Sequence, residues 1–270
     1  MDFVGAKDWI SCFEKGWIFM LAGYYTIASG MLTRQREIDV LGNNLINAQT
    51  PGYRADRLII SPFEQELLTR MEANGADVLG NGVAVTSAVV GDEVSLFNMG
   101  AIKDTGREMD MAIGGDGFYN IQGQGGTVYL TRNGRFDIDA EGYLILPDYG
   151  RVMGQNGPIQ VRNAGFQVEE NGDIYSSDGR YIEKLLVTVP PNGTTLEKLN
   201  NGMFQFPGGA QMPQAENIVI AQRSLELSNV DMNREMIYLI EAQRAFQACS
   251  SALQTVDAIN RKAATQIGSV

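Results

Sequence analysis

Four acidic residues in one short segment have a spacing that could hold a metal ion. Asp137, Asp139 and Glu141 alternate ahead of Gly142, and Asp148 stands at the twelfth position of the segment. Alternating carboxylates around a glycine turn are typical of an EF-hand calcium loop. The twelfth residue is aspartate instead of a bidentate glutamate, and the flanking residues favour strands instead of helices. We therefore predict a hairpin turn with exposed acids, with calcium binding as the alternative.

Two further patterns could support enzymatic chemistry. Glu108 and Asp110 would share one face of a strand, and together with Asp116 they could supply the carboxylate pair of a glycoside hydrolase. The glycine-rich stretches 114–117 and 123–126 lack the lysine and the following helix of a phosphate-binding loop. Nothing in the sequence indicates a cleft around these residues. We predict that the chain is not an enzyme and that it binds no metal or cofactor.

The composition excludes several other functions. The 270 residues contain no histidine, so Ser-His-Asp catalysis, Cys-His catalysis and His-containing zinc sites are impossible. Cys12 and Cys249 are too few for a disulfide framework or a thiolate zinc site, and we interpret both as small apolar residues. A net charge of -11 disfavours binding to nucleic acid, because phosphate backbones repel an acidic surface.

The first residues resemble neither a secretory signal nor a membrane anchor. Asp2, Asp8 and Glu14 precede or interrupt the apolar residues, and no basic segment stands ahead of them. The apolar run at 17–32 is short for a bilayer span and contains glycines. We predict no stable membrane insertion.

Helical periodicity marks both ends of the chain. Apolar residues recur at helical spacing between 21 and 48, and Thr50-Pro51-Gly52 ends that pattern. A second run without glycine or proline extends from 232 to 266, after cap-type residues that begin at Asn229. The apolar stripes of these two predicted helices include Ile27, Met31, Ile38, Leu41 and Leu45, and then Met236, Leu239, Ile240, Phe246 and Leu253.

The middle of the chain has the pattern of a β domain. Apolar and polar residues alternate at 109–113, and glycine-containing turn signals recur at short intervals up to 179. Several hairpins in succession predict an antiparallel sandwich or barrel at about residues 100–215. The fold class is therefore mixed α and β: helices from both termini form one discontinuous helical domain beside a central antiparallel β domain.

The segment between the first helix and the β domain gives a weaker pattern. We treat residues 53–100 as a connection that contains a short helix at 61–71 and strands at 77–96. Each long amphipathic helix needs a partner for its apolar stripe. Periodicity leaves two arrangements open: the helices pack on each other within one compact monomer, or they also bury apolar surface between neighbouring subunits.

Three motifs resemble those of flagellar rod and hook proteins. Residues 30–32 and the segment from Asp39 to Tyr53 (DVLGNNLINAQTPGY) are similar to the family's N-terminal signature, although alanine is usual where Ile46 stands. Residues 228–231, 235–237, 242–246 (AQRAF) and 254–257 resemble the C-terminal signature. Residues 105–118 and 131–144 resemble strands of the family's β domain. The resemblance adds to the predicted assembly residues Asn44, Asn47, Thr50, Gly52, Tyr53, Asn229, Gln243 and Arg244.

The resemblance covers about residues 20–265 and implies a structural subunit of the bacterial flagellar basal-body rod, of proximal or distal type. Rod subunits polymerise into a hollow helical tube that transmits torque from motor to hook and forms the export channel. Their terminal helices pair as a coiled coil that lines the tube, and the β domain forms the outer layer. The implied partners are copies of this chain, other rod, hook and basal-body subunits, and the flagellar type III export apparatus.

The same resemblance sets the expected boundaries and location. The subunit would be exported unfolded, without a cleaved signal, to the extracytoplasmic basal body in the periplasm or cell-wall zone, and its ends would order on assembly. We expect the first helix at 20–52 and the C-terminal helix at 228–267. Residues 1–19 are then an extension or the product of a misplaced start, and we favour the latter. The alternative function is an adhesin-like surface protein whose β domain binds a ligand while the helices oligomerise.

Overall fold

The computed structural model describes a chain with two compact units. The described residues are 5–62, 88–191, 196–199, 202–206, 213–215 and 218–267. The helical unit consists of residues 1–43, 56–94 and 233–270, and the β unit consists of residues 44–55 and 95–232. This division confirms the predicted fold class, because segments from both ends of the sequence form the helical unit and most of the middle of the sequence forms the antiparallel β unit.

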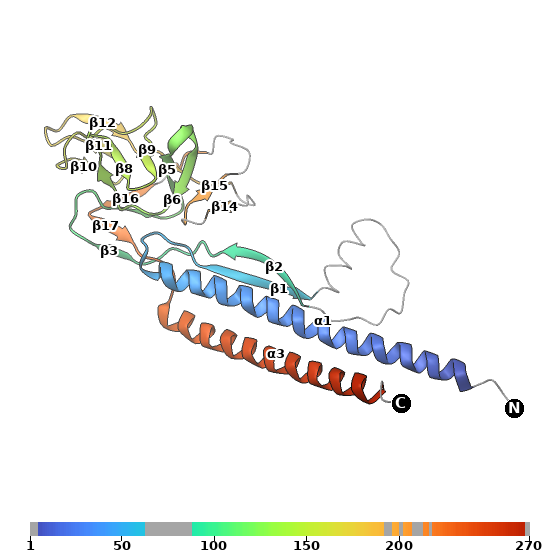
Figure 1. Ribbon diagram of the computed structural model, residues 1–270. Coiled ribbons are helices and arrows are strands. Elements are labelled where there is room, and N and C mark those ends of the chain that lie inside the picture. Colours follow the sequence, from blue (N-terminus) through green and yellow to red (C-terminus); the bar gives the residue numbers. More distant parts are fainter. Residues whose placement is uncertain are drawn as a thin grey trace. The chain divides into compact units, whose positions relative to one another are not determined.

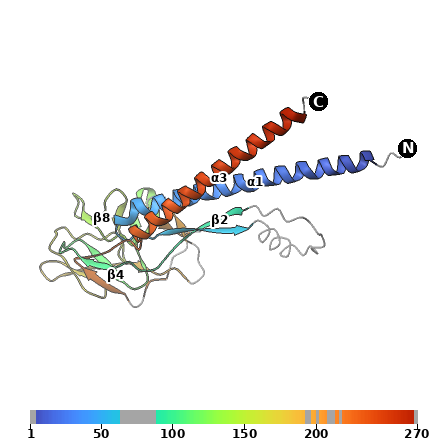
Figure 2. The ribbon, with the colours of Figure 1, turned by 90° about the horizontal axis from the view of Figure 1, so that it is seen from below.

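Two long helices dominate the helical unit. Helix α1 (Gly5–Ile46) and helix α3 (Met232–Ile267) pack together and run in opposite directions (Figures 1 and 2). They approach closely at Gly30, where a Cβ atom would lie 4.0 Å from the Sγ atom of Cys249. Most of the shielded side chains of α3 recur at alternating intervals of four and three residues: Glu235, Leu239, Ala242, Phe246, Cys249, Leu253, Val256, Asn260 and Ala263. This spacing is that of a coiled-coil seam. Ala245 and Ser250 are half-buried beside this series.

The first helix differs from its expected bounds at both ends. It begins at Gly5, so residues 5–19 continue the helix that the sequence placed from Met20 onward. It ends at Ile46 and passes into a 3-10 turn, η1 (Asn47–Gln49). Thr50 then adopts extended geometry (φ -76°, ψ 121°), as expected for a residue that precedes a proline.

A two-stranded sheet completes the described part of the helical unit. It pairs β1 (Asp56–Pro62) with β2 (Ala88–Ser95). The helix that we expected at 61–71 begins within β1 at residues 61–62, where the structure has a strand, and its remainder lies outside the described residues. Within the part of the chain that the structure describes, no helix combines the length and the apolarity that a membrane span requires.

The β unit consists of short antiparallel strands. Its strands are β3 (Ile102–Asp104), β4 (Met111–Gly114), β5 (Phe118–Gln122), β6 (Val128–Thr131), β7 (Asp137–Ile138), β8 (Leu144–Leu146), β9 (Gly150–Val152), β10 (Gln167–Val168), β11 (Asp173–Tyr175), β12 (Tyr181–Lys184), β13 (Val187–Thr188), β14 (Glu197–Lys198), β15 (Phe204–Gln205), β16 (Val219–Gln222) and β17 (Ser224–Glu226), with a 3-10 turn, η2 (Gln124–Gly126), between β5 and β6.

The largest described sheet has the order β14-β15-β6-β5-β9-β8-β7, and β13 also pairs with β5. Strand β5 is buried on both faces: Tyr119 and Ile121 belong to the main core, while Phe118 packs with Leu130 and Phe204 on the other side. Strands β10, β11 and β12 form a separate sheet. The alternation at 109–113 predicted a strand, and the structure has β4 there, but Met111, Ala112 and Ile113 are all buried instead of alternating in exposure.

Two strands lie beyond the predicted end of the β domain at residue 215. Strand β16 pairs with β4, and β17 pairs with β3, so the first and last strands of the β unit are neighbours. Their partners are more than a hundred residues away in the sequence. The local pattern does not report such pairings, and for this reason the boundary was set too early.

Candidate assembly surfaces

The seam leaves several large apolar side chains of α3 exposed. Met236, Ile237 and Ile240 expose 48%, 57% and 47% of their surface, and Met232 is also exposed. Because Met232, Met236 and Ile240 follow each other at intervals of four residues, they lie on one stripe along the helix. The predicted positions Leu239, Phe246 and Leu253 belong instead to the seam, as their half-burial shows.

The other predicted helix positions divide in the same way. On α1, Leu41 is buried, while Ile27, Met31, Ile38 and Leu45 are half-buried. On α3, Gln243 and Arg244 are exposed and lie outside the seam. Further large apolar side chains are exposed on the described surface of the helical unit: Tyr24, Tyr25, Leu32 and Ile259. Packing within one chain therefore leaves part of the apolar surface of both helices uncovered.

A buried carboxylate joins the first turn of α3 to the sheet of the helical unit. Glu235 is 2% exposed and accepts a hydrogen bond of 2.5 Å from the Arg57 guanidinium of β1. The same guanidinium lies 5.1 Å from the ring centroid of Tyr238. An acidic residue in the first turn also interacts favourably with the helix dipole.

The N-terminal signature forms a tight turn within the β unit. The Tyr53 hydroxyl donates to Asn44 Oδ1 at 3.3 Å, and the Thr50 hydroxyl donates to Asn47 Oδ1 at 3.2 Å. Gly52 has a φ of 67°, and a Cβ atom there would overlap the backbone of residue 132. These predicted assembly residues are mostly shielded inside one subunit. Their role in contacts between subunits stays a prediction.

Three buried charges lie beside this turn, and we call them the Glu226 cluster. Arg54 and Arg132 both pair with the Glu226 carboxylate, with N–O distances of 2.7 and 3.3 Å. All three side chains are at most 3% exposed. Arg132 also donates to the carbonyl oxygens of Ile113 at 3.2 Å and Gly115 at 2.5 Å. Burial lowers the pKa of Arg132, and the Glu226 charge opposes that shift.

The side chain of Asn229 cross-links neighbouring segments. Its Oδ1 atom accepts from the Ala55 amide at 2.7 Å, and its Nδ2 atom donates to the carbonyl oxygens of Leu96 at 2.8 Å and Asn98 at 3.0 Å. The sequence pattern suggested that Asn229 caps the C-terminal helix. In the structure these three hydrogen bonds hold the segment before α3 within the β unit.

Sequence reasoning did not identify Glu226 or Arg132 as functional residues. A charged residue within a segment of otherwise strand-forming residues is a local signal for a buried ion pair. It does not show which residue carries the opposite charge.

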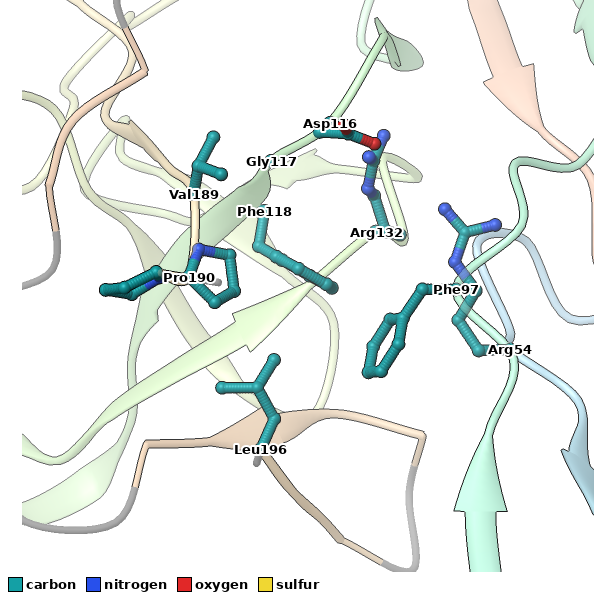
Figure 3. A pocket seen from close by; sticks show the side chains of 10 residues that line it. Arg54, Phe97, Asp116, Gly117, Phe118, Arg132, Val189, Pro190 and Leu196 are labelled. Carbon is teal, nitrogen blue, oxygen red and sulfur yellow. The ribbon is translucent and has the colours of Figure 1, made fainter. Parts of the chain in front are cut away.

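A pocket of about 250 Å³ lies against the Glu226 cluster (Figure 3). Its lining combines apolar side chains with charged ones: Arg54, Phe97, Asp116, Gly117, Phe118, Arg132, Val189, Pro190, Pro191 and Leu196. Asp116 lines this pocket, but neither Glu108 nor Asp110 does. Glu108 pairs instead with Arg223, and Asp110 accepts from the Thr105 hydroxyl. The structure does not assemble the carboxylate pair that a glycoside hydrolase needs.

The two glycine-rich stretches are connections between strands. Residues 114–117 link β4 to β5, and residues 123–126 link β5 to β6 through η2. The Asn-Gly-Thr segment at 192–194, which the sequence predicts to be a turn, lies outside the described residues.

The candidate calcium segment is a hairpin between β7 and β8. The Gly142 amide donates to the Asp139 carbonyl oxygen at 3.0 Å, which confirms the predicted turn. Asp139 and Glu141 both pair with Arg151, whereas Asp137 pairs with Arg107. Asp148 lies in the next turn, with a φ of 70°. Among the described residues, no group of three or more acidic or cysteine side chains is arranged to hold a metal ion.

The Asp139 carboxylate stabilises this hairpin in a pH-dependent way. Desolvation raises its pKa, but the amides of Tyr143 and Glu141 and the charge of Arg151 outweigh it, so the pKa lies below 3.8. Such a carboxylate stabilises the fold above its unfolded pKa, and this contribution is lost as the pH falls through the folded pKa. We expect Asp139→Asn to lower the Tm at neutral pH. At a pH far below 3.8 the same substitution should change the Tm by a smaller amount. A Tm difference that is the same at both pH values would contradict this assignment.

Comparisons with known proteins identify the family. The model described as "Flagella basal body rod protein" matches residues 25–54, "Flagellar hook protein FlgE/F/G D1 domain" matches 112–161, and "Flagellar basal body rod FlgEFG protein C-terminal" matches 221–267. These three ranges contain the signature turn, the centre of the large sheet, and α3 with the segment before it.

The whole chain is also similar to curated rod proteins. It is 30% identical to the basal-body rod protein FlgG of Borreliella burgdorferi, over 88% of this chain and 96% of that protein. It is 29% identical to FlgG of Bacillus subtilis, over 89% of this chain and 97% of that protein, and 27% identical to the rod protein FlgF of Caulobacter vibrioides, over 91% and 98%. Together with the paired terminal helices and the antiparallel β unit, these matches show that the chain belongs to the flagellar basal-body rod family and is a structural subunit, not an enzyme.

Proposed function

We propose that this subunit polymerises into a hollow helical tube through the apolar surface that its helix pair leaves exposed. One observation carries the proposal: Met236, Ile237 and Ile240 lie outside the seam although they are large and apolar. Burial of such side chains contributes about 1.5–3 kcal/mol each, so a neighbouring subunit that covers them would gain substantial stability. In the proposed tube the stripe would contact a different surface of the next copy. Such a head-to-tail contact builds a helical filament when the rotation between copies does not close a ring.

In the assembled rod, the helices would line the tube and the β units would form its outer layer. The tube would transmit torque from motor to hook and carry exported subunits through its channel. Its neighbours would be copies of this chain and other rod, hook and basal-body subunits. We further propose that the type III export apparatus delivers the chain unfolded, without a cleaved signal, to the extracytoplasmic part of the basal body. Similarity to both FlgG and FlgF leaves the proximal or distal position open.

Charged substitutions on the exposed stripe should block assembly without unfolding the β unit. We expect Met236→Glu and Ile240→Glu each to abolish motility and to leave few basal bodies with a complete rod, because a carboxylate would be buried without a partner. Electron microscopy of isolated basal bodies measures the rods, and thermal unfolding of the purified variant measures the β unit. The matched control is Ser251→Glu, which adds the same charge at an exposed polar position of α3 outside the predicted assembly residues. Normal rods in the Met236 and Ile240 variants would contradict the proposal.

Removal of residues 240–270 separates the rod function from the adhesin-like alternative. A subunit that polymerises through its helices should lose all motility and form no rod after this truncation. A surface-binding protein should leave flagella intact. Intact flagella in the truncated strain would therefore overturn the proposed function as a whole.

A further inference from the structure

Three stretches of chain connect the β unit to the helices and to the β1–β2 sheet. They are residues 44–55, 95–100 and 226–232, and we call them the entry segments. The chain continues from them into α1 and β1, into β2, and into α3. Any force on those elements reaches the β unit through these segments. How they are held to each other therefore decides whether they move singly or together.

Glu226 connects two entry segments to its own. Its carboxylate pairs with Arg54 of the first segment and accepts from the Gly100 amide of the second at 3.0 Å. Its own carbonyl oxygen accepts from the Gly52 amide at 2.8 Å. The same carboxylate also pairs with Arg132, the residue that follows β6, and Arg132 donates to the carbonyl oxygen of Ile113. The side chain and the backbone of one residue thus reach the other two segments and the large sheet.

Asn229 repeats this arrangement with neutral groups. Its amide side chain binds Ala55 in the first segment and both Leu96 and Asn98 in the second. The Leu96 amide in turn donates to the Ala55 carbonyl oxygen at 2.8 Å, so the first two segments also bind each other. All three entry segments therefore meet at two neighbouring nodes, one ionic and one neutral.

We propose that Glu226 and Asn229 lock the three entry segments into one joint that opens only as a unit. Separation of one segment alone would leave the buried Glu226 charge or the backbone amide of the buried residue Ala55 without its partner, and both are costly. Loss of either node therefore also loosens the hydrogen bonds of the other node, in which the replaced residue takes no part. The mechanical role of the joint rests on the proposed rod function: torque would pass between the helices and the β unit without being lost as twist of a single connection.

Amide hydrogen exchange resolved by residue tests the joint in the purified full chain. Asn229→Ala should speed exchange at Gly52 and Gly100, whose amides bind Glu226 and not Asn229. Arg54→Lys should likewise speed exchange at Ala55 and Leu96, whose amides bind Asn229 Oδ1 and the Ala55 carbonyl oxygen. The matched control Arg151→Lys changes an ion-paired arginine of the same unit away from the joint and should alter none of these amides. Should Arg54→Lys fail to fold, Asn229→Ala decides, because it removes only neutral hydrogen bonds.

Faster exchange confined to amides that bind the replaced side chain would overturn the joint. Its mechanical role has a separate test in a strain that carries Asn229→Ala. We expect normal numbers of basal bodies and normal swimming in dilute medium, with loss of rotation as the viscosity rises. Rotation equal to that of the Arg151→Lys strain at every viscosity would overturn the mechanical role. Missing rods in the Asn229→Ala strain would also overturn the mechanical role, because Asn229 would then be needed for rod assembly. Failure of the proposed rod function is distinguishable, since the truncation at 240–270 and the Met236 and Ile240 variants report on it separately.

Discussion

Glu226→Gln is expected to lower the free energy of unfolding of the β unit by about 3–5 kcal/mol, the usual cost when one partner of a buried ion pair is removed. The variant would leave two guanidinium groups, Arg54 and Arg132, each at most 3% exposed, without their counter-charge. It would also weaken the acceptor for the Gly100 amide. Burial already disfavours the charged form of Arg132 and lowers its pKa. Loss of the Glu226 charge would therefore leave a buried guanidinium without the carboxylate that stabilises its charge.

Urea unfolding, monitored by tyrosine fluorescence, measures this loss of unfolding free energy, because the tyrosines of the core become exposed in the transition. The matched control is Glu141→Gln, which removes a partner of Arg151 at a carboxylate that is 67% exposed. Exposed ion pairs contribute about 0–1 kcal/mol, so the control should lie within that range. A loss below about 1 kcal/mol for Glu226→Gln would mean that the two arginines find other partners.

Phe136→Ala is expected to cost about 3–5 kcal/mol, as is usual when a buried phenylalanine is truncated. Phe136 is fully buried in the main core, and its ring lies edge-on to Tyr119 with centroids 5.1 Å apart. Truncation removes the transfer free energy of the ring, leaves a cavity and breaks this aromatic contact. Phe136→Leu should cost less, because it retains most of the buried apolar volume. Equal losses for the two variants in the same unfolding measurement would contradict a packing role.

Tyr119→Phe is the matched control in that core. Burial raises the pKa of the Tyr119 hydroxyl, and the hydroxyl has no hydrogen-bond partner among the described residues. Removing a buried donor that has no partner should leave the stability unchanged or raise it. A marked loss would show that the hydroxyl is satisfied by a group such as an ordered water.

The sequence predicted those parts of the fold that depend on neighbouring residues. Helical periodicity located both long helices, and glycine turn signals located the hairpins, including the β7–β8 turn at Gly142. It did not predict β16 and β17, because their partners are distant in the chain. The start of α1 was also missed, since the resemblance to rod proteins set the expected boundary at Met20.

The candidate site was predictable to a similar extent. A 3.6-residue period placed Met236, Leu239 and Ile240 on one stripe, whereas the packed seam selects Leu239 and leaves the other two exposed. Periodicity reports which side chains are apolar, but not which of two adjacent faces meets the partner helix. The Glu226 cluster was missed for a different reason. Buried charges look like surface residues until their partners are known, and these partners come from three separate segments.

The pairing of first strands with last strands governs when this protein can fold. Apart from isolated bridges, the described strand partner of β3 is β17 and that of β4 is β16. Both strands can therefore pair only after residues 219–226 are available. A chain that emerges from its N-terminus onward, from a ribosome or through a narrow channel, cannot close the β unit until almost the whole sequence has appeared. Pairings over such separations also form slowly, because the loop must close first. The topology therefore leaves β3 and β4 without these strand partners until residues 219–226 are available.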